Sequence, residues 1–135
     1  MEIEVLGSSS AGNAYLVSDG SSSILLECGL PLRDMQRKSD FKIAQADACL
    51  ISHFHIDHSR AVHDVIKMGV DVYALPETLS ALGVQNHYRT HSIEPLKPVT
   101  VNTFEIMAKQ SNLEKIGLER RNEYELVRND VQKNQ

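Results

Sequence analysis

The stretch Ala48-Cys49-Leu50-Ile51-Ser52-His53-Phe54-His55-Ile56-Asp57-His58 decides how this 135-residue sequence is interpreted. Its first four residues are a continuous apolar run, which is typical of a buried strand. In an extended or loop backbone, His53, His55 and Asp57 share one side because successive side chains alternate, and His58 lies at the turn into the next helix. Four side chains of the types that bind metals therefore converge directly after a strand.

These residue types favour a metal site. Imidazole nitrogens suit Zn(II), and Mn or Fe are also possible. A carboxylate beside them can hold a second metal or take a proton from a bound water, so a complete site would hold two ions. Scattered histidines usually have no ligand role, but the position of this cluster between a buried strand and a helix predicts metal binding. Hydrolysis is the natural chemistry of such a site.

The flanking residues predict an α/β arrangement. Val62, Val65 and Ile66 recur at helical spacing, and Gly69 stands where a C-terminal cap is needed before the strand-like residues 70–75. With residues 48–51 they form a βαβ unit, whose ligand site is expected at the carboxyl end of the first strand. The other expected elements are strands over 2–6, 14–17 and 24–26, a polar loop over 7–12, helices over 31–38 and 76–82, and one or two strands over 99–107.

The pattern His53-x-His55-x-Asp57-His58 after an apolar strand resembles the H-x-H-x-D-H motif of metallo-β-lactamase-fold hydrolases. Residues 7–17 and 24–29 also resemble the opening strands of a bacterial and phage branch of that family, whose members are thought to act on nucleic acid. The resemblance covers residues 1–108. It implies an α/β fold, namely the N-terminal half of a metallo-β-lactamase αββα sandwich.

The resemblance also implies roles for individual residues. His53 and His55 would bind the first metal, while Asp57 and His58 would bind the second. Asp57 would also be the catalytic residue that transfers a proton. Glu27 stands where the family usually has an Asp that supports the metal loop from behind the ligands, and it is one methylene longer. Ala61 stands near a position where many members have Gly.

The C-terminal half of the family's fold supplies a third His, a bridging Asp and a final His, and this sequence lacks them. No residue after position 91 is a histidine, and Asp130 is the only Asp beyond Asp71. Residues 109–135 are instead a charged tail. Its apolar residues keep a rough helical register, which predicts an appended, partly exposed helix after a partial domain over 1–108. These residues are Leu113, Ile116, Tyr124, Val127 and Val131.

Two functions follow. The first is a metal-dependent hydrolase, phosphodiesterase- or nuclease-like, that uses a metal-bound hydroxide on nucleic acid or another phosphodiester. The second is a truncated, catalytically inactive metal-binding or interaction module, because two to four ligands are too few to hold two metals in a fixed geometry. An uncovered half-sandwich would expose apolar surface, so a homodimer or a complementary chain is the expected partner.

Composition narrows the setting. A net charge of -4 and a pI near 5.8 give no general attraction to polyanions, so any contact with nucleic acid would be local. Cys28 and Cys49 are expected to be buried, reduced thiols, because there is neither a secretory signal nor dense cysteine spacing. No apolar run approaches the roughly 20 residues that span a bilayer. These features predict a cytoplasmic protein without a membrane role.

Other candidate sites are weaker. Residues 7–12 have the spacing of a phosphate-binding loop, but Asn13-Ala14 stands where Lys and Ser or Thr are required, so a turn near the metal site or an ordinary loop is expected. His63 is interpreted as a surface or core residue. His87 and His91 have a spacing that brings ligands together only on a helix, which their surroundings disfavour.

Overall fold

Two β-sheets and one layer of helices make up the described residues, 1–110 and 122–128, of the computed structural model. The larger sheet has the order β1-β2-β3-β4-β5-β6. The first three strands pair antiparallel, and β3 to β6 pair parallel. These strands are β1 (Glu2–Ser9), β2 (Gly12–Ser18), β3 (Ser23–Leu26), β4 (Ala48–Leu50), β5 (Val72–Ala74) and β6 (Thr90–Ser92).

The structure corrects the polar loop predicted over residues 7–12. β1 continues through Ser9 and β2 begins at Gly12, so that only Ser10 and Ala11 form the turn. Ser9 pairs with Gly12 in the register, which closes a hairpin with a two-residue connection. Small polar residues that suggest a loop can therefore also continue a strand pair to its end.

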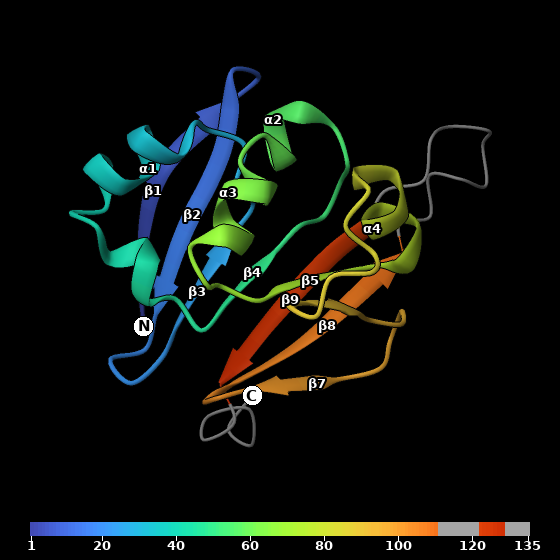
Figure 1. The fold of residues 1–135 in the computed structure, drawn as a ribbon. Coiled ribbons are helices and arrows are strands. Elements are labelled where there is room, and N and C mark those ends of the chain that lie inside the picture. The colour runs from blue at the N-terminus through green and yellow to red at the C-terminus, as the bar shows by residue number, and fades with distance from the viewer. Residues whose placement is uncertain (111–121, 129–135) are drawn as a thin grey trace.

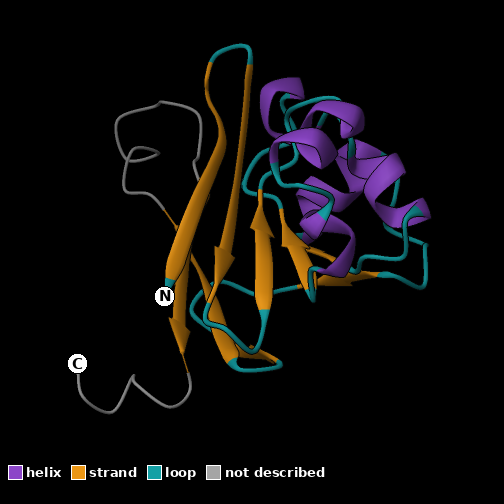
Figure 2. Ribbon diagram, turned by 90° about the vertical axis from the view of Figure 1, so that its left-hand side faces the viewer, coloured by secondary structure: helices purple, strands orange, loops and turns teal. Residues whose placement is uncertain are grey.

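The helices all lie on one face of the larger sheet, as Figure 2 shows. The expected helix–strand unit is confirmed: α3 connects the metal loop to β5, and Gly69 ends it with a φ of 96°. No helix in the described part of the chain is long and apolar enough to cross a membrane. The helices are α1 (Leu32–Lys38), the 3-10 helix η1 (Lys42–Gln45), α2 (Ile56–Ser59), α3 (Val62–Lys67) and α4 (Pro76–Leu82).

Buried side chains lie on both faces of the central strands. Leu25 and Cys49 belong to the core cluster under the helices, whereas Ile24 and Leu50 pack with Phe104 of the second sheet. Because neighbouring residues of a strand face opposite sides, a strand covered on both faces needs apolar residues at every position. This arrangement explains the continuous apolar run that precedes the metal loop.

The smaller sheet has the order β7-β8-β9 and is antiparallel throughout (Figure 1). Its strands are β7 (Val99–Val101), β8 (Phe104–Gln110) and β9 (Asn122–Arg128). Packed against the larger sheet, it completes the two inner layers of the predicted half-sandwich. The α/β fold class is thus confirmed.

The prediction of a helical tail is wrong for residues 122–128, which form β9. In this stretch Glu123 and Glu125 alternate with Tyr124 and Leu126, a period of two that the approximate helical register obscured. Backbone pairing with β8 supplies the stability that the segment lacks as an isolated helix. Residues 111–121 and 129–135 lie outside the described part, so the helix prediction there, and the division at residue 108, stay predictions.

Candidate metal centre

The metal loop, residues 52–58, leaves the carboxyl end of β4 and ends in α2. The Ser59 hydroxyl donates to the carbonyl oxygens of Phe54 and His55, each at 2.9 Å. The amide of Cys28, just after β3, donates to the carbonyl of His58 at 2.9 Å. The loop is therefore closed on itself and attached to the neighbouring strand connection.

Glu27 is the hydrogen-bonding centre of the site. Its Oε1 accepts the amide of Ser52 at 2.8 Å, and its Oε2 accepts the Ser52 hydroxyl and lies 2.9 Å from Nδ1 of His58. The Glu27 backbone adopts the left-handed conformation, with a φ of 64°, which is uncommon for a residue with a side chain. The longer side chain therefore reaches the metal loop from an unusual backbone position, in agreement with its expected supporting role.

This single carboxylate orients two imidazoles. Since a carboxylate oxygen accepts, Nδ1 of His58 carries the proton that faces Glu27. Since the Ser52 hydroxyl donates to Glu27, its oxygen accepts from Nδ1 of His53, 2.7 Å away. In the neutral form of each ring, Nε2 then carries the lone pair, and that is the atom a metal requires.

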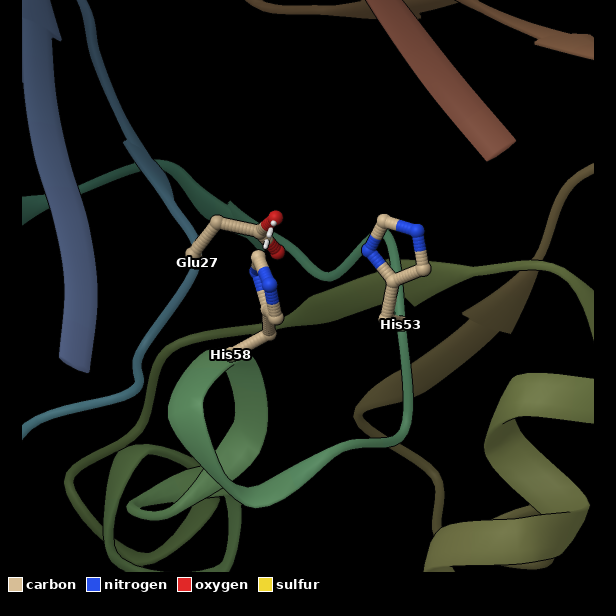
Figure 3. A group of neighbouring side chains, drawn as sticks. All are labelled: Glu27, His53 and His58. Carbon is tan, nitrogen blue, oxygen red and sulfur yellow. Dashed lines mark hydrogen bonds and ion pairs between the residues drawn. The ribbon is translucent and has the colours of Figure 1, made fainter. Parts of the chain in front are cut away.

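Glu27, His53 and His58 bring one possible ligand atom each within 4.8 Å of one another (Figure 3). We assign Glu27 to support and not to metal ligation, because both its carboxylate oxygens already accept hydrogen bonds from the loop. Two imidazoles with fixed tautomers and a carboxylate partner are the chemistry that Zn(II) ligands show in proteins. The donor set therefore fits such an ion.

His55 and Asp57 lie beside this group without belonging to it. The His55 ring stacks on that of His53, with centroids 6.2 Å apart and planes inclined by 12°. Oδ2 of Asp57 lies 3.6 Å from Nε2 of His58. The structure thus keeps all four predicted residues in one loop, while their assignments as ligands, and that of Asp57 to proton transfer, stay predictions.

Two residues that contact the site have no role predicted from the sequence. Ser52 links His53 to Glu27, and its position directly before the first histidine was a local signal for that role. Asn13 contacts Asp57 from 44 positions away in the sequence. No local pattern could have shown that contact.

The remaining histidines and the cysteines do not join the centre. Nε2 of His91 lies 2.9 Å from Asp71, while His87 stacks on Tyr88, so this pair does not converge. Cys28 and Cys49 are buried and unpaired by a disulfide, as predicted. A hydrogen bond with Cys28, together with burial, raises the pKa of the Cys49 thiol well above its usual range.

The model of the metallo-beta-lactamase superfamily matches residues 9–120. The fold is similar to that of YhfI, a metallo-beta-lactamase fold protein from Bacillus subtilis, with a TM-score of 0.71 and 17% identity over 93% of this chain and 57% of that one. A Cronobacter sakazakii metallo-beta-lactamase with a HARLDQ motif gives a TM-score of 0.69 and 14% identity, over 93% of this chain and 52% of that one.

The subclass B3 metallo-beta-lactamase BJP-1 of Bradyrhizobium japonicum gives a TM-score of 0.61 and 18% identity, over 79% of this chain and 48% of that one. At these identities the likeness shows the fold alone. The chain spans about half the length of these solved structures, and it fits their N-terminal half. No curated protein sequence matches it.

Proposed function

This chain belongs to the metallo-β-lactamase superfamily of metal-dependent hydrolases, and on that premise we propose that its metal loop binds Zn(II) for the hydrolysis of a phosphodiester. The observation that carries the proposal is the hydrogen bonding of Glu27, which fixes the tautomers of His53 and His58 side by side. His55 and Asp57 would complete the ligands that this chain offers. Mn or Fe would suit the same atoms less closely.

The residues of the loop have separate tasks in this proposal. A bound divalent metal would lower the pKa of water and stabilise negative charge on the substrate. His53 and His58 would hold the metal through Nε2, and the hydrogen bonds of Glu27 and Ser52 keep both rings in place. The Asp57 carboxylate, half-buried beside His58, accepts a proton and can release it to solvent.

We propose a phosphodiester as the substrate class, and in particular a phosphodiester of nucleic acid. The protein has a net charge of -4, so general electrostatics repel a polyanion. Affinity for phosphate would therefore have to come from the metal centre itself. The two unpaired, buried thiols suit a reducing compartment, and we propose the cytoplasm as the setting.

The test combines metal content with catalysis. We expect purified chain to retain at least one Zn(II) and to hydrolyse bis(p-nitrophenyl) phosphate, and His55→Ala and His58→Ala to lose both properties. His63→Ala, an exposed histidine on α3, is the matched control and should behave as wild type. Less than one metal per chain, with equal rates in wild type and His58→Ala, would overturn the proposal. Hydrolysis of a β-lactam alone would change the substrate class.

The second candidate function is an inactive metal-binding or interaction module, and the exposed face of β1 favours it. Ile3 and Val5 are 64% and 60% exposed. Ile3 pairs with Val17, which is buried between the two sheets, and directly opposed residues share one face. The apolar face that packs between the sheets therefore continues onto β1, where its side chains are exposed to solvent.

A partner that covers this face would be a second copy of the chain or a complementary chain. Light scattering of purified protein tests this: a dimer that Ile3→Ser and Val5→Ser dissociate supports the second copy. A monomer whose mass and solubility are the same in the wild type and in both variants would contradict an interface on β1.

A further inference from the structure

Asn13, the second residue of β2, contacts the metal loop through its side-chain amide. Its Nδ2 lies 3.2 Å from the carbonyl oxygen of Asp57 and 3.5 Å from that residue's Oδ2. The same nitrogen lies 3.0 Å from the carbonyl oxygen of Ser9. One amide group therefore connects the β1–β2 hairpin with both the backbone and the carboxylate of Asp57.

The chemistry of these partners fixes which amide atom faces them. Backbone carbonyls and a carboxylate only accept hydrogen bonds, so the group that faces them has to be the NH2 of the amide. An aspartate at position 13 would have nearly the same shape but would present an acceptor to three acceptors. The site consequently requires an asparagine for its donors and not merely for its size.

Gly29 packs directly against the backbone of Asp57. Its amide donates to the carbonyl of Asn13 at 2.9 Å, and a Cβ built on Gly29 would lie only 1.8 Å from the carbonyl oxygen of Asp57. The Asp57 backbone therefore lies against Gly29 and is bonded to the Asn13 amide. Three segments far apart in sequence meet at this one carbonyl.

We propose that Asn13 is a positioning residue of the metal centre, which sets the Asp57 carboxylate beside His58. Among the described residues, Nδ2 of Asn13 is the donor that faces this carboxylate, while Nε2 of His58, which carries a lone pair, lies 3.6 Å from Oδ2. Because Nδ1 of His58 is turned toward Glu27, the Asn13 amide is the group that can donate a hydrogen bond to the Asp57 oxygens. The inference rests on the proposed function in so far as Asp57 is given a role in metal binding or proton transfer.

The first arm of the test uses metal-free protein. Hydrogen exchange of the peptide that covers residues 53–61 should become several-fold faster in Asn13→Ala and in Asn13→Asp. Asn86→Ala is the matched control, because Asn86 is an exposed turn residue whose side chain makes no hydrogen bond within the described residues. Should Asn13→Ala fail to fold, Asn13→Ser, which keeps one donor, takes its place and should give an intermediate rate. Exchange equal to that of wild type would overturn the inference.

The second arm measures Zn(II) affinity by competition with a chelating dye. We expect Asn13→Ala to weaken binding about tenfold, which is the usual effect of losing a residue that orients a ligand. In an Asp57→Ala background the same change should have a clearly smaller effect, because only the bonds to backbone carbonyls are then left to lose. Equal losses in both backgrounds would show that Asn13 acts on general stability and would overturn the positioning role.

The two arms also separate this inference from the proposed function. A wild-type chain that binds Zn(II) no better than His58→Ala defeats the proposed function, while the exchange measurement still decides whether Asn13 holds the loop. Tight binding in wild type and in Asn13→Ala defeats the inference alone.

Discussion

At each of the two edges formed by the strand ends of the larger sheet, a histidine lies 2.9 Å from a carboxylate. Only one of these two pairs belongs to the candidate metal centre. At the carboxyl end of β4, His58 contacts Glu27, and at the amino end of β5, His91 contacts Asp71. The side chains of the first pair are 23% and 13% exposed, and those of the second 39% and 34%. Both pairs have the same chemistry, so their surroundings make the difference.

The third partner distinguishes the two edges. Ser52 and His53 join the Glu27 pair, neither of them is a permanent cation, and His53 adds a second imidazole to the site. Arg89 joins the Asp71 pair, with Nη1 3.0 Å from Oδ1, and this hydrogen bond raises the pKa of the guanidinium. A carboxylate whose charge is already balanced by a permanent cation attracts a metal ion less strongly. A histidine–carboxylate pair therefore indicates a metal site only when its neighbours add ligands and no cation.

The largest effect is expected from adding one methyl group behind the metal loop. A Cβ at Gly29 would meet the Asp57 carbonyl carbon at 2.3 Å, so Gly29→Ala should lose about 3 kcal/mol of unfolding free energy and most Zn(II) affinity. Gly69→Ala, beside Arg89 at the other edge, meets its nearest atom at 3.9 Å. Gly69→Ala should lower the unfolding free energy only by the strain of a left-handed backbone, about 1 kcal/mol. Denaturant unfolding and zinc competition measure both, and equal losses would refute the difference between the edges.

Next comes removal of one histidine at each edge. His58→Ala should weaken Zn(II) binding by more than about 100-fold, because it deletes a proposed ligand and not only a supporting residue. His91→Ala should leave the zinc affinity unchanged. Calorimetric titration of the two variants measures their Zn(II) affinity. Weaker zinc binding in His91→Ala would mean that a metal ligand lies at the amino end of β5.

A smaller change follows when only the carboxylate is neutralised. Glu27→Gln keeps the size of the side chain but weakens its hold on His58 and Ser52, so Zn(II) affinity should fall about tenfold. Asp71→Asn is the matched change and should leave the affinity as it was. An unchanged affinity in Glu27→Gln would mean that the imidazoles keep their orientation without it.

The difference between the edges also shows which features the sequence could predict. The metal loop and the strand before it were predictable because ligands, apolar run and helix are contiguous from residue 48 to residue 66. The position of Glu27 in a left-handed conformation and the contact of Asn13 with Asp57 depend on tertiary packing, which no local pattern records. β9 was missed for a related reason, since its strand period is stabilised by pairing with β8. Sequence thus locates the candidate metal loop better than the residues that hold the loop in place.

The smallest expected effect concerns Tyr73, whose ring stacks on His91 at the Asp71 edge. Burial, and to a smaller extent the charge of Asp71, raise the pKa of Tyr73 above 10.0. A raised pKa in the folded state means that stability is complete below the pKa of the unfolded chain and is lost as the pH rises through the folded value. Unfolding free energy should therefore decline above about pH 10 in the wild type and decline less in Tyr73→Phe.

Absorbance titration at alkaline pH measures the same group directly. Tyr73→Phe should remove a late phase of tyrosine ionisation, and Asp71→Asn should move that phase only slightly toward lower pH, because burial is the larger cause of the shift. If Asp71→Asn abolished the late phase, the charge of Asp71 would outweigh burial. That edge would then resemble the metal loop in being organised around a carboxylate.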